Sequence, residues 1–512
     1  MTGRSRAALF LLLTLPLISA AQDTHATAEK IRAVYRSKYS PQLVPMLTEV
    51  LRFPTFEGNT AARDQQQAWI AKVAPQLGLT VRNAGLVTEV ELPGPKGAPV
   101  LGLVVHGDVQ PVNEAEWTFP PFSGVEKNGV VYGRGAADDK GPLVQALLAM
   151  ASLKDSGVAR THTIRLLVGS DEESTNQDIT SYLKEHKAPN LSLVLDSSFP
   201  VVVGEKAWSA FTVTASDAYA AISKGGPGFL LTKLDAGLAT SIVPSRADSE
   251  LQWVGDESGF EDVMHRIQNY TVPKGYKLEV KRNGKNVTVT AFGHSAHAGV
   301  NLEGGRNALV LLAHVLDGHV YGRAADLLKF AGQSGHDLYG ASLGLPGKDP
   351  LWGRYAVNVA TIKTDKDHPE NLTLTINIRA NPKMYGTALR AHLEKRLSEF
   401  NAAHQEDFTA GGFYDDAPLA FDPNAKLVKR LMADYSRATG ENLPPAISGG
   451  GTYAKRLPHA IAFGMWFPGK PYPGHDVDEQ ITVKDLNRGV NVLLEALADI
   501  ACSVPVNEPF KP

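Results

Sequence analysis

Short apolar runs alternate with helical segments along the first part of the chain. Three of these runs, from Val100 to Val105, from Ile164 to Val168 and from Leu191 to Leu195, are typical of buried parallel strands. Between the first two, the segment from Pro142 to Ser152 is apolar almost all round, which predicts a helix buried against the sheet. A helical pattern from Thr27 to Leu51 precedes them. Together these patterns predict an open α/β sheet.

The pattern changes near Trp208. The stretch KLEVKRNGKNVTVTAF alternates on both sides of Asn283 and Gly284, a pair typical of β-hairpins, and NLTLTINIR alternates again. With GGRNALVLLAHVL as a helix between them, these strands predict a second, α+β domain inserted in the first. After it, helix and strand patterns of the first kind return. We therefore divide the chain into a leader (1–21), a first part of the main domain (22–207), an inserted domain (208–385) and a second part of the main domain (386–512).

The N-terminal stretch MTGRSRAALFLLLTLPLISAAQD has the features of a secretory signal peptide. Arg4 and Arg6 precede an apolar run from Ala7 to Ile18, and small residues follow up to Ala21. The run is short for a membrane span, so we expect cleavage near Ala21 and export to the periplasm or the medium. An uncleaved N-terminal anchor is the alternative. After cleavage we expect no stable insertion in a membrane.

Charge and cysteine content limit the binding partners and the metal ligands that the chain can have. Loss of two arginines with the leader would change the formal net charge from -3 to -5, which leaves no basic surface for nucleic acid. A small molecule is therefore the expected partner. Cys502 is the single cysteine, so a metal cannot be held by a thiolate cluster. Histidine and carboxylate side chains remain as ligands.

The stretch GRGAADDKGP, which begins at Gly133, places two adjacent carboxylates among glycines just before the predicted buried helix. It differs from a dinucleotide fingerprint because Asp138 replaces the third glycine, where a pyrophosphate would approach. It also differs from a phosphate-binding P-loop, because no Ser or Thr follows Lys140. A cation is the partner that fits.

Polar residues follow each predicted strand. His106 and Asp108 follow the first, the run Asp171 to Glu173 follows the second, and Asp196 follows the third. A histidine after a strand is more often structural, and an acidic run is more often a solvated loop. However, ligands gather outside the carboxyl ends of strands in open α/β sheets, and so many carboxylates would repel one another without cations.

Histidine and carboxylate ligands suit two Zn²⁺ ions, with Mn²⁺ or Co²⁺ as substitutes. A pair of ions needs a bridging carboxylate, for which Asp138 is the candidate. Asp108 is then expected to orient the His106 imidazole without binding metal. The neighbours Glu172 and Glu173 can divide two roles, one binding metal and the other accepting the proton of an activated water.

The motifs VVHGDV, YGRGAADDKGP, DEE, LDSSFP and GHDVDEQI follow in this order along the chain. In order and spacing they resemble the di-zinc metallopeptidase family that includes aminoacylase, carboxypeptidase G, carnosinase and bacterial dipeptidases. The resemblance covers nearly the whole chain after the leader, and FPVVVGEKA and SGGGTYAKRLP are most similar to its dipeptidase and carnosinase-like branch. It implies that Glu172 is the general base, that the inserted domain is a lid, and that the metal ligands are His106, Asp138, Glu173, Asp196 and His475, with Asp138 binding both ions.

The same resemblance implies two groups from the lid. In GHSAHAG, His297 matches the histidine that stabilises the oxyanion, and in INIRANP, Arg379 matches the arginine that binds a substrate carboxylate. A surface ion pair is the alternative for Arg379. Ser241 stands where the family commonly has Asn, so a contact with the substrate there is left open. Glycines of the SGGGTY motif either form a flexible turn or let backbone groups approach the termini of a peptide, namely Gly449, Gly450 and Gly451.

These observations lead us to expect an exported, zinc-dependent exopeptidase that hydrolyses dipeptides or short peptides through a water activated by two metals. The alternatives are hydrolysis of N-acyl amino acids or a carboxypeptidase activity at the same site, and a metal-dependent binding protein without catalysis. Either a monomer or a homodimer is compatible with the sequence.

Overall fold

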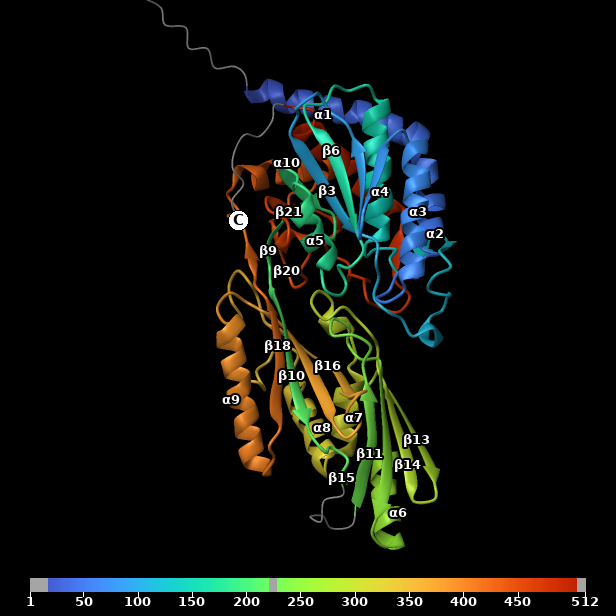
Figure 1. The fold of residues 1–512 in the computed structure, drawn as a ribbon, viewed down its shortest axis with the longest axis vertical. Helices are drawn as coiled ribbons and strands as arrows, with labels where there is room; N and C mark the ends of the chain where they lie inside the picture. The colour runs from blue at the N-terminus through green and yellow to red at the C-terminus, as the bar shows by residue number, and fades with distance from the viewer. Residues whose placement is uncertain (1–16, 221–227, 504–512) are drawn as a thin grey trace, which may run out of the picture.

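The computed structural model describes residues 17–220 and 228–503, which form two bodies joined end to end (Figure 1). One body, at the top of that view, is built on an α/β sheet, and the other is built on an antiparallel sheet with helices against it. Most of the predicted leader lies outside the described residues, and its last part begins helix α1 (Leu17–Val34). None of the described helices is long and apolar enough to cross a membrane.

The first body contains a six-stranded sheet with the order β1-β2-β6-β3-β7-β21. Strands β6, β3, β7 and β21 run parallel, whereas β2 is antiparallel to β6 and β1 is antiparallel to β2. The sheet confirms the predicted α/β class with a mixed open sheet. Its strands are β1 (Thr80–Ala84), β2 (Val87–Leu92), β6 (Thr163–Gly169), β3 (Val100–His106), β7 (Leu191–Val194) and β21 (Ala460–Ala462).

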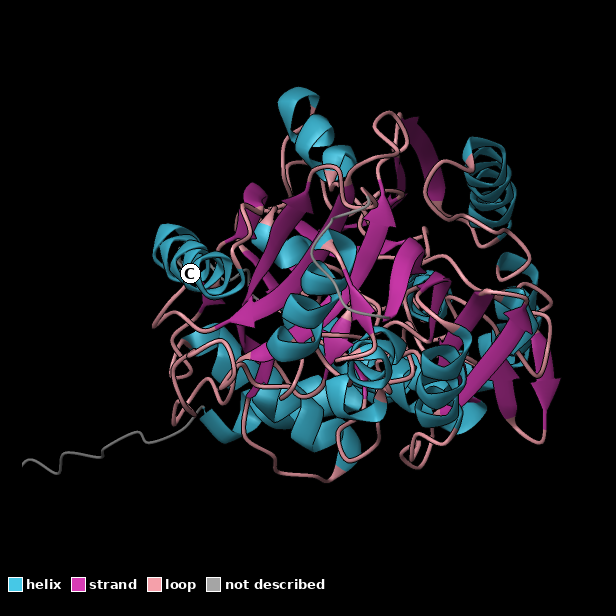
Figure 2. Cartoon of the chain, turned by 90° about the horizontal axis from the view of Figure 1, so that it is seen from below, coloured by secondary structure: helices cyan, strands magenta, loops and turns pink. Residues whose placement is uncertain are grey.

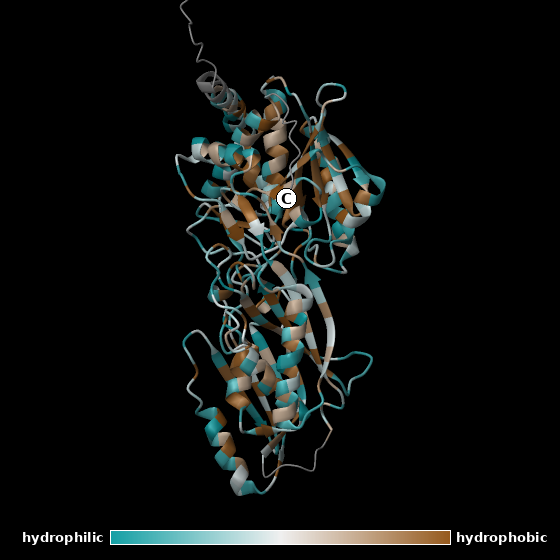
Figure 3. Ribbon diagram, turned by 90° about the vertical axis from the view of Figure 1, so that its left-hand side faces the viewer, coloured by the Kyte–Doolittle hydropathy of each residue, from teal (hydrophilic) through white to brown (hydrophobic). Residues whose placement is uncertain are grey.

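Alternate side chains of β3 enter two different cores, because successive residues of a strand point to opposite faces. Leu103 lies in the core that contains α4 (Lys140–Asp155) and α11 (Val483–Ile500). Val104 lies in the core of the other face, beneath α5 (Gln177–Glu185). The first fourteen residues of α4, from Lys140 to Leu153, are all buried, as expected for a helix that is apolar almost all round. Figure 3 shows the hydrophobic residues concentrated on the strands and the helices packed against them.

Other helices complete this body. The N-terminal helices α1 and α2 (Leu43–Val50) pack against α4, so the predicted helical segment from Thr27 to Leu51 is confirmed apart from a π-helical and a 3₁₀ turn between the two helices. Helix α3 (Thr60–Gln76) packs beside β1, and α10 (Lys426–Thr439) packs against α11.

The second body contains a nine-stranded sheet with the order β13-β14-β12-β11-β16-β17-β10-β18, in which the short β15 (Val320–Tyr321) pairs with β11. Helices α6 (Glu257–Gln268), α7 (Ala308–Leu316) and α8 (Arg323–Ser334) pack against it. Figure 2, seen from below, shows helices beside the strands. The long strands are β13 (Lys277–Asn283), β14 (Asn286–Phe292), β12 (Arg246–Val254), β11 (Gly228–Ala236), β16 (Ala356–Thr364), β17 (Leu372–Ala380), β10 (Ala207–Ala215) and β18 (Thr409–Asp416).

The predicted hairpin is confirmed. Strands β13 and β14 pair from Asn283 opposite Asn286 outwards, which leaves a two-residue turn of Gly284 and Lys285. Gly284 has a φ of 62°, a conformation that glycine adopts without steric cost.

The chain enters the second body between β9 (Val202–Glu205) and β10 and leaves it after β18, where β19 (Leu419–Ala420) pairs with β9. The sheet therefore extends to Asp416, whereas the sequence placed the boundary at residue 385. Helix α9 (Gly386–His404) packs against β18 and β10 and also belongs to this body. The sequence TAGGFYDD of β18 conceals its strand character, because glycine and aspartate are depleted in strands.

Three short sheets complete the first body. They are β19-β9-β20, β22-β8 and β23-β5-β4. Their remaining strands are β20 (Ala446–Ser448), β22 (Met465–Trp466), β8 (Ser197–Ser198), β23 (Gln480–Thr482), β5 (Val130–Tyr132) and β4 (Val125–Lys127).

Candidate metal centre and substrate cavity

The carboxyl ends of three parallel strands meet at one edge of the six-stranded sheet. His106 is the last residue of β3, Glu173 lies in the turn after β6, and Asp196 lies two residues after β7. Because β3 pairs with β6 on one side and with β7 on the other, these side chains are brought to one place, as the sequence predicts.

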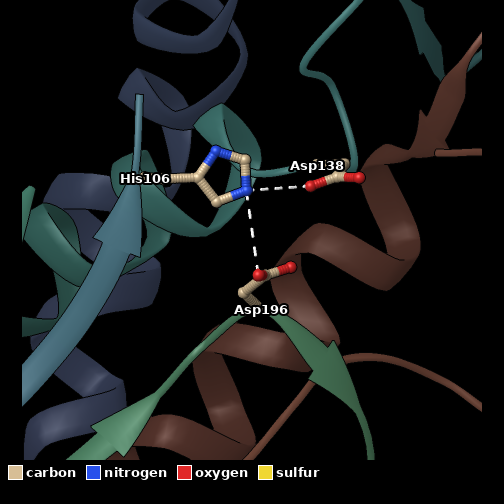
Figure 4. Close-up of side chains that lie close together, drawn as sticks. All are labelled: His106, Asp138 and Asp196. Carbon is tan, nitrogen blue, oxygen red and sulfur yellow. Dashed lines mark hydrogen bonds and ion pairs between the residues drawn. The ribbon is translucent and has the colours of Figure 1, made fainter. Parts of the chain in front are cut away.

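The first cluster of possible metal ligands contains His106, Asp138 and Asp196 (Figure 4). The Nε2 atom of His106 lies 3.0 Å from Oδ1 of Asp138 and 3.8 Å from Oδ2 of Asp196. One ligand atom from each residue lies within 4.8 Å of the other two. Imidazole nitrogen and carboxylate oxygen are ligands that zinc accepts.

The second cluster contains Asp138, Glu173 and His475. The Nε2 atom of His475 lies 3.2 Å from Oδ2 of Asp138 and 3.1 Å from Oε1 of Glu173. Asp138 therefore directs one carboxylate oxygen to each cluster. A carboxylate that faces two ligand sets in this way is suited to bridge two cations.

The electrostatics of these clusters favour positive charge. Burial lowers the pKa of His475, but the carboxylates of Glu173 and Asp138 outweigh burial and raise the pKa to about 10. Burial also lowers the pKa of His106, and hydrogen bonds to aspartates raise it well above its usual value. Burial and the charge of Asp138 raise the pKa of Asp196 well above its usual value. These shifts show that the clustered carboxylates attract positive charge, and the nitrogen and oxygen donors fit a pair of divalent cations.

The turn that carries Asp138 is held by a buried carboxylate, Glu479. Its Oε1 atom accepts hydrogen bonds from the backbone N–H groups of Ala137 at 2.8 Å and Asp138 at 3.0 Å. Its Oε2 atom accepts from the Gly135 N–H at 3.1 Å and from the guanidinium of Arg134 at 2.7 Å. Four donors thus converge on one side chain with no exposed surface, and together they fix the backbone from which the bridging aspartate projects.

Asp108 supports the centre in two ways. Its backbone oxygen lies 3.0 Å from Nδ1 of His106, whereas its carboxylate lies 3.6 Å away. The carboxylate instead accepts hydrogen bonds from the N–H groups of Glu172 at 3.2 Å and Glu173 at 2.9 Å. Asp108 therefore orients the imidazole mainly through its main chain, and its side chain fixes the turn that carries the two glutamates.

Glu172 lines the cavity beside the clusters but belongs to neither of them. Burial raises the pKa of its carboxyl well above the usual value; the positive charge of His106 opposes this, and the charge of Asp196 reinforces it. A carboxylate with a raised pKa is a stronger proton acceptor than an ordinary carboxylate, and once protonated it can donate the proton again.

His297 comes from the second body and stacks on His475, with ring centroids 4.2 Å apart. Its Nδ1 atom accepts hydrogen bonds from the backbone N–H groups of Gly299 at 2.9 Å and Val300 at 3.1 Å. Burial and the charges of His475 and Arg379 lower its pKa well below the usual value. The neutral ring therefore carries its hydrogen on Nε2 and can act there as a donor.

Arg379 lies on β17 with 2% of its surface exposed. Its guanidinium donates hydrogen bonds to Asn377 at 3.0 Å, to the carbonyl oxygen of Gly449 at 3.2 Å and to the hydroxyl of Ser241 at 3.0 Å. All three acceptors are neutral, and burial lowers the pKa of Arg379 to about 9. A buried cation bonded only to neutral acceptors is suited to bind an anionic ligand.

The three consecutive glycines have different surroundings. A Cβ atom on Gly449 would lie 1.9 Å from the carbonyl oxygen of Gly299, so the backbones of the two bodies meet there. A Cβ atom on Gly450 or Gly451 would meet nothing nearer than 3.4 Å, and both residues line the cavity. The need for glycine at 449 thus comes from contact with the second body.

A cavity of about 420 Å³ lies between the two bodies, within the size range of sites for small ligands. Carboxylates of the clusters form one wall, and Trp466, Tyr472 and the glycines line other parts. A second cavity of about 100 Å³ adjoins it, because His297 and His475 line both. Arg379 and Ser241 line this smaller cavity.

Several supporting residues have no signal of their own in the sequence. Glu479 lies in the motif GHDVDEQI, four residues after His475, and this proximity is the only feature of the sequence that connects Glu479 with the metal centre. The carboxylate of Asp178 accepts hydrogen bonds from the Ser170 N–H at 2.7 Å and from the Tyr453 hydroxyl, and so links the turn before Glu172 to the glycine-rich loop.

Comparisons with known proteins show the family and the fold to which the chain is similar. Residues 102–499 match the sequence profile of Peptidase family M20/M25/M40. The chain is 29% identical over 403 residues to the Beta-Ala-Xaa dipeptidase of Lactobacillus delbrueckii subsp. lactis, which covers 78% of this chain and 82% of that protein. Human carnosine dipeptidase 1 has a similar fold, with a TM-score of 0.57 and 12% identity over 92% of this chain and 98% of the other. The di-peptidase Dug1p of Saccharomyces cerevisiae gives a TM-score of 0.56 and 13% identity over 94% and 98%.

Proposed function

Because the chain belongs to Peptidase family M20/M25/M40, we propose that it is an exported, metal-dependent exopeptidase that hydrolyses dipeptides or short peptides. The observation that carries this proposal is the position of Asp138, which faces two ligand clusters at the wall of a cavity that also holds Glu172. The dipeptidase name of the Lactobacillus relative supports the choice of substrate.

We assign the first cation to His106, Asp138 and Asp196, and the second to Asp138, Glu173 and His475. Zinc fits this nitrogen and oxygen donor set, and manganese or cobalt can replace it. Bound there, the cations would polarise the scissile carbonyl and make an attacking water more acidic.

Glu172 moves the proton. Its carboxylate accepts a proton from a water molecule as the water oxygen attacks the carbonyl carbon of the peptide. The resulting carboxyl donates the same proton to the peptide nitrogen as the C–N bond breaks, and the amine leaves. The raised pKa of Glu172 suits both transfers, because the side chain must gain and lose a proton in each cycle.

Two residues of the second body, which acts as a lid, bind and stabilise the substrate. His297 donates its Nε2–H to the carbonyl oxygen as negative charge develops there. Arg379 has two N–H groups beyond its three hydrogen bonds, enough for a bidentate contact with the C-terminal carboxylate of a dipeptide. Gly450 and Gly451 leave room for the backbone of the peptide.

His297 reaches the centre from the same polypeptide, which supports a site formed within one chain. We therefore propose that the activity does not depend on a second subunit, so that a monomer or a homodimer can carry it. For export, we propose cleavage near Ala21 and release into the periplasm or the medium. Cell fractionation and N-terminal sequencing test this, and a mature protein that still begins at Met1 would contradict it.

Substrate class is tested by measuring release of free amine from a dipeptide library and from N-acetyl amino acids, with and without a chelator. Cleavage of dipeptides that stops with chelator supports the proposal. Cleavage of N-acetyl amino acids alone would assign the chain to the amidohydrolases. Activity that is unchanged in chelator would refute metal dependence.

A further inference from the structure

The hydroxyl of Ser241 is the meeting point of two donors. It lies 3.0 Å from Nε1 of Trp208 and 3.0 Å from an Nη2 atom of Arg379. An indole N–H and a guanidinium N–H can only donate, so the Ser241 oxygen accepts both hydrogen bonds and uses both of its lone pairs. The hydrogen of the Ser241 hydroxyl therefore points away from both donors. Ser241 lines the small cavity together with Glu173 and His297, so this hydrogen is available to a ligand there.

Trp208 reaches this position through the register of the lid sheet. It lies on β10 directly opposite Arg379 on β17, with Asp416 of β18 opposite it on the other side. The guanidinium carbon of Arg379 lies 5.9 Å from the centre of the indole ring, and Tyr414 packs edge-on against the ring at 5.3 Å. The indole is thus fixed between a cation and an aromatic side chain, with its N–H aimed at Ser241.

The guanidinium of Arg379 is restrained along three of its edges. Asn377 holds Nε, the carbonyl of Gly449 holds Nη1 and Ser241 holds Nη2. Without the Trp208 hydrogen bond, the Ser241 hydroxyl could rotate, and its lone pairs would no longer be fixed toward Arg379. The orientation of the guanidinium therefore depends on a residue that does not bond to it directly.

We propose that Trp208 and Ser241 are positioning residues, which orient the Arg379 guanidinium and the Ser241 hydroxyl hydrogen toward the carboxylate of a bound peptide. This inference rests on the proposed function, in which Arg379 binds that carboxylate. It predicts that the pair contributes to binding of ligands with a free C-terminal carboxylate and contributes nothing to their C-terminal amides.

The test measures the Kd of Ala-Ala and of Ala-Ala amide by calorimetry, with zinc-loaded Glu172→Gln protein so that the ligand is not consumed. Trp208→Phe keeps the ring and removes the N–H, Ser241→Ala removes the hydroxyl, and Ser241→Thr retains it. We expect Trp208→Phe and Ser241→Ala to weaken binding of Ala-Ala by about 10- to 150-fold, as for loss of one hydrogen bond to a charged group. Binding of the amide should stay within about twofold by the same reasoning, and Ser241→Thr should bind like the parent protein.

Equal weakening for both ligands, or no weakening for Ala-Ala, would overturn the inference. Failure of the parent protein to bind Ala-Ala would overturn it as well. By contrast, carboxylate-dependent binding together with no cleavage of Ala-Ala by the wild-type enzyme would support the inference and refute only the proposed function.

Discussion

Replacement of Glu479 by Gln tests whether the Glu479 carboxylate fixes the turn from which the bridging Asp138 projects. The wild-type carboxylate accepts four hydrogen bonds, two on each oxygen, from Arg134 and from three backbone N–H groups that include that of Asp138. A glutamine of the same shape keeps one acceptor oxygen. Its amide N–H₂ group would face the two donors that had bonded to the other oxygen.

The loss in free energy of unfolding follows from the number of hydrogen bonds that the substitution removes. Two buried donors would lose their acceptor, at about 1–3 kcal/mol each, and Arg134 would lose its carboxylate partner. Breaking a buried ion pair by removal of one partner costs about 3–5 kcal/mol, so we expect a destabilisation of this size within the turn from Arg134 to Asp138. Because Asp138 projects from that turn, zinc affinity should fall by about 10- to 100-fold.

Zinc affinity is measured by competition with a chromogenic chelator, and stability by denaturant unfolding of the same preparations. Glu91→Gln is a matched control, since Glu91 accepts hydrogen bonds from Arg165 at 3.1 and 3.0 Å on the six-stranded sheet and takes no part in the metal clusters. The control should bind zinc like the wild type. A Glu479→Gln protein with wild-type zinc affinity would refute the account of how Asp138 is positioned.

Three further predictions follow from the site and its surroundings. Glu172→Gln should retain zinc but lose kcat by about 100- to 10,000-fold, and a near-wild-type rate would exclude Glu172 as the proton carrier. Gly449→Ala would bring a Cβ atom within 1.9 Å of the Gly299 oxygen, so kcat/KM should fall by about 100-fold through loss of closure; Gly347→Ala, where an added Cβ atom meets nothing within 4 Å, should stay near wild type, and equal effects would contradict the closure contact. Burial raises the pKa of Glu205 from 4.5 to about 7, so between these values the folded chain holds a proton that the unfolded chain has released, and the free energy of unfolding falls as pH rises. Denaturant unfolding at pH 5 and pH 8 should show a loss of about 2.5 kcal/mol that Glu205→Gln lacks, and the same pH dependence in both proteins would contradict it.

The central sheet could be predicted from the sequence, because buried parallel strands leave continuous apolar runs. The family could be predicted because five ordered motifs resemble those of its members. The topology of such a sheet alone predicts that the polar residues after those runs, such as His106 and Asp196, lie close together, and the structure places these two in one cluster. The comparisons confirm the predicted family. His475 lies far along the chain from these strands, and it was found through its motif and not through any local pattern.

Asp108 was predicted to support the centre because it lies two residues after His106, but more distant supporting residues were not predicted, because their roles depend on tertiary contacts. Glu479 and Trp208 act through hydrogen bonds to segments more than thirty positions away. Burial of such side chains gives no periodic signal when they lie in loops or at a strand end. The lid boundary shows the same limit, since β18 pairs with β10 across about two hundred residues and carries two glycines.

Ser241 illustrates how structure changes an interpretation made from sequence. Its shorter side chain, compared with asparagine, left its contact with the substrate open. In the structure this short side chain lies between Trp208 and Arg379 and accepts a hydrogen bond from each.

The central claim is that Asp138 joins two cation sites, and anomalous scattering from zinc-soaked crystals tests it most directly. The account predicts two zinc peaks about 3.5–4 Å apart, one among His106, Asp138 and Asp196 and the other among Asp138, Glu173 and His475. A single peak, or peaks away from Asp138, would contradict it.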